Sequence, residues 1–193
     1  MRKSKKKQVI LSLLVVCLLF LGLFIFAFFF YRNKDKVNPN DLVIKFDTSD
    51  VIALDNVLPL ADALGKKLDG TEVGEGAQGY VAFSLKNKSS SEIQYEIYLT
   101  PQNVDDKVIN DNYVKLYLTD SSNYPMKGFE MNMIPSFADL AVLEDKPESR
   151  LLYSGSIAGN DNHKLRLRVW LSDNYSLSDD KESFKFDVNI RSK

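Results

Sequence analysis

The sequence predicts an all-β protein: an antiparallel β-sandwich, Ig-like or jelly-roll, of seven or eight strands, preceded by one N-terminal transmembrane helix. Three observations support this fold class. Residues 9–31 form one unbroken apolar run; beyond it, apolar and polar side chains repeatedly alternate; and no segment there keeps a strong helical period for more than about two turns. Alternation places successive side chains on opposite faces of a strand, so each sheet is expected to bury one face.

The apolar run at residues 9–31 reads VILSLLVVCLLFLGLFIFAFFFY and contains no charged residue. About 20 apolar residues cross the hydrocarbon core of a bilayer as a helix. The competing interpretation is a cleaved signal peptide, whose apolar core spans about 7–15 residues and ends in small residues. This run is longer and ends in FFFY at residues 28–31. We therefore expect a retained signal anchor.

The charges around the apolar run predict its orientation. The basic segment, residues 1–8, holds five Lys or Arg, against three after the run that are offset by Asp35. This bias favours a cytoplasmic N-terminus and an extracellular C-terminal domain, as in a single-pass protein of the cell membrane. Lipidation at Cys17 is disfavoured because bulky Val16 precedes it and apolar residues follow. The phenylalanines of the outer half contact lipid or, alternatively, another helix.

The N-terminal 36 residues and the rest of the chain differ in charge and in cysteine content. Residues 1–36 hold eight Lys or Arg and one Asp, whereas residues 37–193 hold seventeen Lys or Arg and twenty-five Asp or Glu. We expect a polar stalk at residues 32–41 and one domain at residues 42–193. An acidic domain argues against nucleic acid or anionic lipid as its partner. The domain contains no Cys, so its core alone must stabilise it.

Seven segments show the alternation of a half-buried strand. The clearest is 163–171, where Leu165 and Leu167 face the core while Lys164 faces solvent, which predicts a central strand. Segments 58–68 and 137–143 can each form a short helix. The turn-rich segments 86–91 and 159–162 are each expected to be a hairpin or a short loop. The expected strands are 42–46, 80–85, 93–99, 113–119, 151–157, 163–171 and 184–190.

The residues that most enzymes need are absent from the sequence. It has one His, His163, and no H-E-x-x-H, G-x-S-x-G or P-loop pattern. The glycines of residues 72–79 are interpreted as a flexible loop. We therefore expect no enzyme, no catalytic residue and no cofactor. A carboxylate-based hydrolase remains an alternative, although twenty-five acids on a small domain produce pairs by chance.

Two acidic loops are the candidates for calcium. One contains Asp105, Asp106 and Asp111, and the other contains Asp179 and Asp180. Carboxylates suit Ca²⁺, but neither loop has the EF-hand spacing, so solvated loops are the preferred interpretation and no metal is expected.

The predicted outer face of strand 163–171 is the candidate partner-binding surface. Strict alternation places Trp170, the only Trp, on the same face as Arg166 and Arg168. An Arg beside a Trp can form a cation–π pair, and Trp and Arg often anchor interfaces. The alternative is that a loop or a second layer covers Trp170.

Two pairs of segments resemble known surface proteins. LRLRVWLS at 165–172 with SFKFDVNI at 183–190 resembles the closing hairpin of camelysin and TasA-type biofilm-matrix proteins. VAFSLKNKS at 81–89 with IQYEI at 93–97 is similar to another of their hairpins. The resemblance implies a Gram-positive cell-surface β-sandwich, fibre-forming in some relatives. The chain departs from them by keeping its anchor, and it lacks a His cluster that would support the metalloprotease activity attributed to camelysin.

Together these patterns predict a membrane-anchored, extracytoplasmic β-sandwich that binds or scaffolds at the bacterial cell surface without catalysis. Its expected partner is a protein or a second copy of itself. An accessory subunit of an envelope or secretion complex is the first alternative, and the hydrolase is the second.

Overall fold

The computed structural model describes residues 20–21, 41–71, 76–102, 108–130, 134–177 and 182–193. The chain divides into two compact units, residues 1–38 and 39–193. Across the described residues, no helix combines the length and the apolar character that crossing a bilayer requires. Apart from Phe20 and Leu21, the apolar run at 9–31 lies outside those residues, as do the basic segment and most of the stalk. The transmembrane helix therefore stays a prediction.

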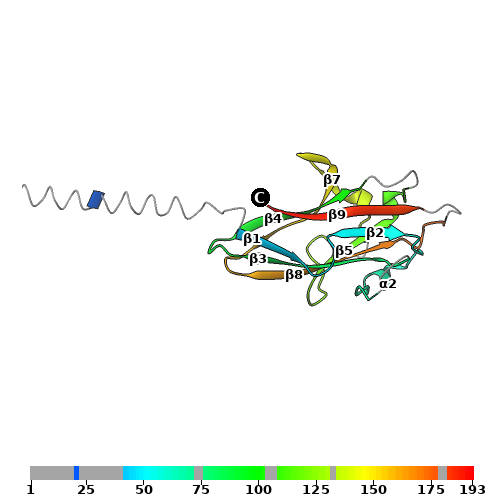
Figure 1. Ribbon diagram of the computed structural model, residues 1–193, viewed down its shortest axis with the longest axis horizontal. Helices are drawn as coiled ribbons and strands as arrows, with labels where there is room; N and C mark the ends of the chain where they lie inside the picture. The colour runs from blue at the N-terminus through cyan, green and yellow to red at the C-terminus, as the bar shows by residue number, and fades with distance from the viewer. Residues whose placement is uncertain (1–19, 22–40, 72–75, 103–107, 131–133, 178–181) are drawn as a thin grey trace, which may run out of the picture. The chain divides into compact units, whose positions relative to one another are not determined.

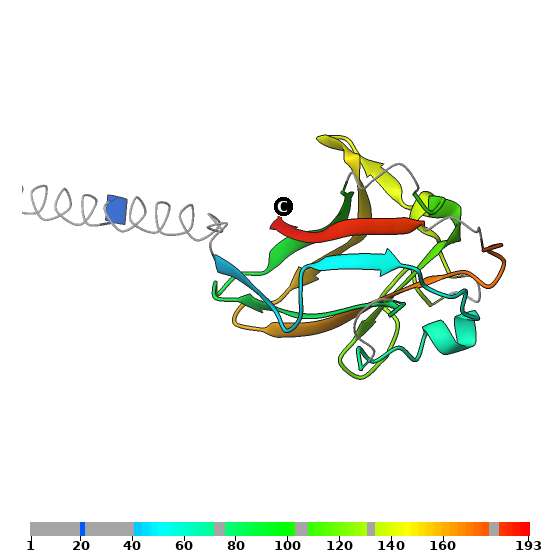
Figure 2. The same ribbon diagram turned by 45° about the vertical axis from the view of Figure 1, so that its right-hand side comes forward.

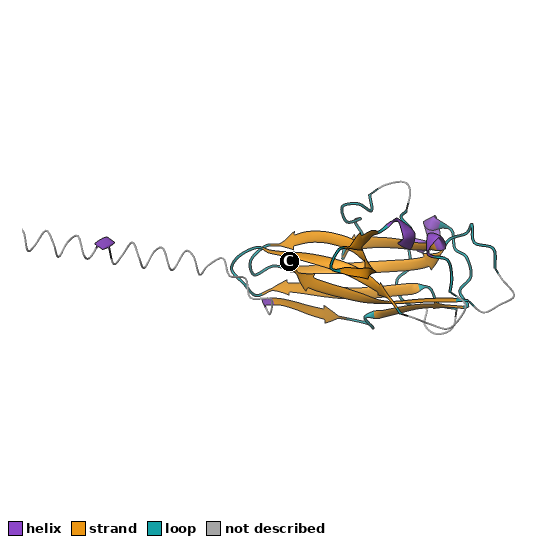
Figure 3. Cartoon of the chain, turned by 90° about the horizontal axis from the view of Figure 1, so that it is seen from above, coloured by secondary structure: helices purple, strands orange, loops and turns teal. Residues whose placement is uncertain are grey.

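Residues 39–193 form two antiparallel sheets, which confirms the all-β sandwich prediction (Figures 1 and 3). Sheet A has the order β1 (Leu42–Phe46), β3 (Gly79–Asn87), β8 (Asn162–Leu171) and β5 (Val114–Asp120). Sheet B has the order β2 (Val51–Asp55), β9 (Ser183–Ser192), β4 (Ile93–Pro101), β7 (Lys146–Ile157) and β6 (Ala141–Leu143).

All seven predicted strands are present, and β1 has the predicted bounds. The described residues contain nine strands rather than seven or eight, because β2 and β6 were not predicted. In β2 the outward position between buried Ile52 and Leu54 is occupied by Ala53, so the alternation is weak. β6 has only three residues, and Val142 at its centre is exposed.

The two hairpins that the resemblance implied, β3 with β4 and β8 with β9, are not formed, because their strands lie in different sheets. β3 and β8 belong to sheet A, whereas β4 and β9 belong to sheet B. The turn-rich segments 86–91 and 159–162 follow the other alternative and are short loops between sheets. The fully buried Asn87 holds the loop at 86–91 in place. Its amide donates to the carbonyl oxygens of Ser91, Ile157 and Ala158, and its side-chain oxygen accepts from the Ser89 N–H.

The core lies between the inward faces of the two sheets. β8 is central, paired with β3 on one side and β5 on the other, as its alternation predicts. Its inward residues Leu165, Leu167, Val169 and Leu171 are at most 2% exposed. Across the core, the rings of Phe137, Phe184 and Phe186 contact one another with centroids 5.0–5.9 Å apart.

Three short helical turns lie between strands. The helix expected within 58–68 is α2 (Asp62–Gly65), only four residues long. The segment 137–143 divides into the 3₁₀ turn η3 (Phe137–Asp139) and strand β6, so the expectation of one helix there is half right. Ser136 and Asp139 form a capping box at η3. A third turn, η2 (Asp111–Tyr113), precedes β5.

The register of β3 defines two ends of the sandwich. At the proximal end Leu42, where the first strand begins, pairs with Asn87. At the distal end Gly79 pairs with Val169, and the segment carrying α2 lies there (Figure 2). The nine residues of β3 separate these ends by about 27–30 Å at the usual rise per residue of about 3.3 Å.

Candidate functional site

Trp170 points outward from sheet A, as alternation predicts, but α2 covers it. Its side chain is 0% exposed, and a Cβ atom placed on Gly65 of α2 would come within 2.2 Å of the indole ring. The indole Nε1 donates to Oδ1 of Asp62, 3.2 Å away. This arrangement agrees with the alternative interpretation, in which a loop or a second layer covers Trp170: the covering segment contains the short helix α2.

Arg168 is also enclosed by its own chain and is 4% exposed. Its guanidinium donates to the Leu68 carbonyl oxygen (2.6 Å), Thr119 Oγ1 (2.8 Å) and Asn123 Oδ1 (2.7 Å). No Asp or Glu among the described residues forms an ion pair with it, and burial lowers the pKa of Arg168. The Arg168 guanidinium thus links the α2 segment, β5 and the turn after β5. Its role is structural.

The three side chains of the expected partner-binding face, Arg166, Arg168 and Trp170, are therefore not all exposed to a partner. Arg168 and Trp170 lie beneath the segment 61–71, so neither can contact a partner in this conformation. Only Arg166 remains half-exposed, and its NH1 donates to Asn123 Oδ1 at 2.9 Å. Alternation predicted which way the side chains point, but not that another segment covers them.

The segment that covers Trp170 forms a hollow at the distal end, here called the distal groove. Its volume is about 520 Å³, within the range of about 300–1,000 Å³ typical of binding pockets. Five of its lining residues are aliphatic or proline: Leu58, Pro59, Leu60, Leu64 and Leu68. Its polar lining residues include Lys67, Asp69, Thr71 and Gln78.

A smaller hollow of about 170 Å³, the side pocket, adjoins the distal groove. Leu58 lines both, so the two form one continuous surface. Its other apolar lining residues include Ile109, Leu171 and Leu177, and Glu182 contributes the only charged side chain among the described lining residues. Together we call the two hollows and their rim the distal apolar surface.

Large apolar side chains are unusually exposed around this surface. Leu58 is 67% exposed, Leu64 55% and Leu177 58%, and all three line one of the hollows. Val108, 54% exposed, is bridged to Ser183 beside Ile109 of the side pocket. Scattered exposed residues need no explanation, but a contiguous group of them marks an interaction site.

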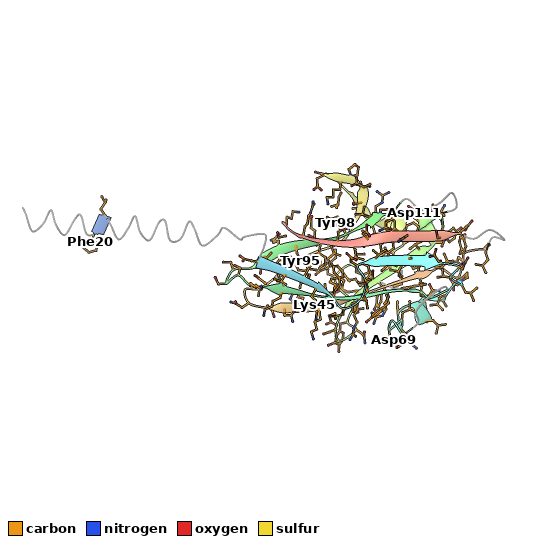
Figure 4. All side chains as sticks on the ribbon, in the orientation of Figure 1. Phe20, Lys45, Asp69, Tyr95, Tyr98 and Asp111 are labelled. Carbon is orange, nitrogen blue, oxygen red and sulfur yellow. The ribbon has the colours of Figure 1, made fainter. Side chains whose placement is uncertain are left out.

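Backbone hydrogen bonds hold the distal groove in shape. Gln78 Nε2 donates to the Leu58 carbonyl oxygen at 2.7 Å, and its Oε1 accepts from the Leu171 N–H at 3.3 Å. The Leu60 N–H donates to the Leu171 carbonyl oxygen at 2.8 Å. At the rim, hydrogen bonds from the Thr71 side chain and backbone hold the pKa of Asp69 below its usual range. Figure 4 shows Asp69 beside α2.

Acidic residues dominate the surroundings of the distal apolar surface. Its described neighbours include two lysines, Lys66 and Lys67. Lys115, in register with Trp170, and the buried Arg168 are also at this end. The described acids there are more numerous: Asp55, Asp62, Asp69, Asp111, Asp173 and Glu182. The surface therefore combines exposed apolar side chains with an excess of negative charge.

The candidate calcium loops lie mostly outside the described residues. Asp105, Asp106, Asp179 and Asp180 cannot be placed, and Asp111 begins η2. Within the described part of the chain, no three His, Cys, Asp or Glu side chains come together as metal ligands would. His163 lies 3.8 Å from Oδ2 of Asp161 and edge-on to the Tyr95 ring.

An ion-pair cluster on the outer face of sheet B was not predicted from the sequence. Glu96 of β4 is 4% exposed and binds Arg191 (2.8 Å) and Lys193 (3.0 Å), and Arg191 also pairs with Asp145 of the β6–β7 turn. Burial raises the pKa of Glu96, but hydrogen bonds from Arg191 and Lys193 outweigh it and hold the pKa below its usual range. The cluster ties the β6–β7 turn to β9 and β4.

Comparison with known proteins adds nothing to this geometry. No protein-family model, no curated protein and no solved structure matches the chain. The function proposed below therefore rests on the residues of this chain alone.

Proposed function

We propose that this protein is a single-pass, membrane-anchored β-sandwich that binds a protein partner at the bacterial cell surface without catalysis. The observation that carries the proposal is the distal apolar surface. Four exposed aliphatic side chains gather at the end of the sandwich opposite Leu42, where its first strand begins. An anchor at residues 9–31 would leave this end farthest along the domain from the point of attachment.

The shape of the surface favours a protein segment as the occupant. Binding energy concentrates in a few large apolar or aromatic side chains that enter desolvated pockets. The distal groove, at about 520 Å³, has room for such a side chain, and the adjoining side pocket offers a second position. Leu58 between them would contact both inserted groups.

The charge of the distal apolar surface favours a different protein, rather than a second copy of this chain, as the partner. Two copies docked through their distal ends would bring together, from each side, more acids than cations. Like charges placed against each other at an interface cost several kcal/mol. A partner that presents large apolar side chains beside Lys or Arg complements both the apolar and the acidic character, and it is the occupant we propose.

The strand order supports a jelly-roll architecture within the sandwich. From β2 to β5, and again from β7 to β9, successive strands alternate between the two sheets. Such alternation is typical of jelly rolls, in which two Greek keys wind around one core. It is compatible with the proposed likeness to camelysin and TasA-type surface proteins, a relationship that stays a proposal.

Photo-crosslinking in living cells tests the proposed docking surface. A photoreactive amino acid replaces Leu58 or Leu177 in the full-length chain, and Val142, also exposed but on the edge of sheet B opposite β2, is the matched control position. We expect both distal positions to capture the same protein, through a peptide that carries apolar residues beside Lys or Arg. An added Leu64→Asp should reduce that capture.

Two results would contradict the docking surface. Equal capture of the same protein from Val142 would mean that contact is not confined to the distal apolar surface. Capture of a second copy of this chain from Leu58 and Leu177 would replace the proposed partner with self-association.

A further inference from the structure

The outward-pointing strand residues of sheet A include cations but no acid, although the domain as a whole is acidic. Along its strands, alternate residues point away from the core. Those outward positions hold six cations and no acid: Lys45 on β1, Lys86 on β3, Lys115 on β5, and Lys164, Arg166 and Arg168 on β8. The outward positions of sheet B include Asp55, Glu96 and Asp187, so the pattern belongs to sheet A.

Three of these cations are exposed, and no ion pair engages them among the described residues. Lys45 and Lys164 both pair in register with Ser84, one on each side of β3. Lys86 follows Ser84 by two residues on the same face. Lys45, Lys86 and Lys164 are all exposed. We call these three residues with half-exposed Arg166 the cationic face.

Strand geometry gives the spacing of the cationic face. Neighbouring strands lie about 4.8 Å apart, so the Cα atoms of Lys45 and Lys164 are about 10 Å apart across β3. Lys86 and Arg166 each lie two residues along a strand from this row, about 7 Å away. The cations thus form an array contributed by three strands, with the three lysines in the half of sheet A nearer the proximal end and Arg166, opposite Ala82, just past the middle of β3. Figure 4 labels Lys45 on β1.

We propose that the cationic face binds the surface of an anionic lipid membrane. Each Lys near such a surface gains about 1 kcal/mol, a roughly fivefold change in binding. Four acids flank the face: Asp41 and Asp47 lie directly before and after β1, Asp161 lies directly before β8, and Asp120, last in β5, shares the inward register of Leu118. At the distal end of β3, Gly79 lies five residues, about 17 Å, from the Lys45–Lys164 row at Ser84, which exceeds the screening length of about 8–10 Å; from Ala82, opposite Arg166, it lies about 10 Å.

The spread of these cations over three strands favours a membrane over a soluble phosphate polymer. Proteins that bind single polyanionic chains do so in a groove that follows the backbone. The two hollows described above are at the distal end, away from these lysines. An array of cations spread over the face of a sheet matches a layer of phosphate headgroups.

This inference rests on the proposed function in one point: the membrane anchor is what would place the domain next to a membrane. With that anchor, the ten-residue stalk at 32–41 limits the domain to about 36 Å from its attachment even when fully extended. The same membrane would then be within reach of the cationic face. The charge pattern that excludes anionic lipid for the domain as a whole does not apply to this one face.

Vesicle flotation with residues 39–193 tests the proposal, because this unit contains both sheets and the described core. We expect the fragment to bind phosphatidylcholine vesicles containing about 30% phosphatidylglycerol, and release by 0.5 M NaCl. Lys45→Gln with Lys164→Gln should weaken binding about 25-fold. Lys45→Arg with Lys164→Arg should retain it.

A matched pair of substitutions separates the cationic face from net charge. Lys146→Gln with Lys185→Gln removes the same charge from sheet B, on the other side of the sandwich, and should change binding less than about twofold. Equal weakening by both pairs, equal binding to pure phosphatidylcholine, or preferential binding of long-chain polyphosphate over the vesicles would each overturn the proposal. The vesicle experiments do not involve Leu58 or Leu177, so their failure would leave the crosslinking test of the distal apolar surface unaffected.

Discussion

Gly65 lies against the face of Trp170 so closely that no larger residue fits between α2 and sheet A. A Cβ atom at position 65 would be 2.2 Å from Cδ2 and 2.3 Å from Cε2 of the indole. Trp170 is fully buried and pairs in register with Lys115 of β5, so the ring cannot easily retreat. This contact sets how near the α2 segment, and with it the distal groove, sits to the sheet.

Gly65→Ala should therefore destabilise the domain although it adds one methyl group. Overpacking a full site costs about 1–3 kcal/mol. Ala63→Ser, at an exposed position of the same helix, should change stability by less than about 0.5 kcal/mol. Urea unfolding of residues 39–193 measures both. Similar stability of the two variants would mean that α2 is free to lift from Trp170.

Leu167→Asp should prevent folding, whereas Arg166→Asp should not. Leu167 is 0% exposed on the central strand β8, where an unpaired carboxylate costs several kcal/mol against a typical total stability of about 5–15 kcal/mol. Arg166, the next residue, is half-exposed and loses only its hydrogen bond to Asn123. Soluble yield and circular dichroism report the outcome. Soluble, folded Leu167→Asp protein would show that β8 is not central.

The alternation of apolar and polar residues predicted inward and outward positions such as Leu167 and Arg166 well, because it reports directly on which face of a strand is buried. It identified β1, β3 and β8 with the inward residues the structure shows. It could not say which sheet each strand joins, because β3 and β4 would show the same pattern as a hairpin or as a crossing. The side-chain hydrogen bonds of Asn87 that hold the crossing are long-range contacts that the local pattern does not contain.

The candidate site was less predictable than the fold. Leu58, which is 67% exposed, looks the same in the sequence as a core leucine. The four-residue helix α2 is too short to show a period, so the sequence allowed a cover over Trp170 but did not show that this segment forms it or that it also covers Arg168. The cationic face appears only when register aligns Lys45, Lys86 and Lys164 across three strands.

Tyr95→Phe should leave the domain equally stable or more stable. The Tyr95 hydroxyl is buried and has no hydrogen-bond partner among the residues that the structure describes, and burial raises the pKa of Tyr95. Removing an unsatisfied polar group removes its desolvation cost. Tyr98→Phe is the matched control: its hydroxyl accepts a 2.7 Å hydrogen bond from Lys146, so its loss should cost about 1 kcal/mol. Thermal unfolding should rank the two variants in this order, and the reverse order would contradict it.

Acid should weaken the cluster around Glu96. Because the folded pKa of Glu96 is held below its ordinary value of 4.5, the stabilisation is fully present above that value and is lost as pH falls through the folded pKa. Glu96→Gln should cost about 1.5–3 kcal/mol at neutral pH, where charged hydrogen bonds to Arg191 and Lys193 are lost. At pH values below the folded pKa of Glu96, the difference in unfolding free energy between Glu96→Gln and the unchanged protein should shrink. Unfolding free energies measured across this range test the sign, and a constant difference would argue against it.

The central claim is that the sandwich faces the outside of the cell on a retained N-terminal anchor, and protease treatment of intact protoplasts tests it most directly. We predict that external protease degrades residues 42–193 while a cytoplasmic marker survives. The intact mass of the untreated membrane-bound protein should still include residues 1–31. A protected domain, or a mature form that begins near Tyr31, would contradict the account.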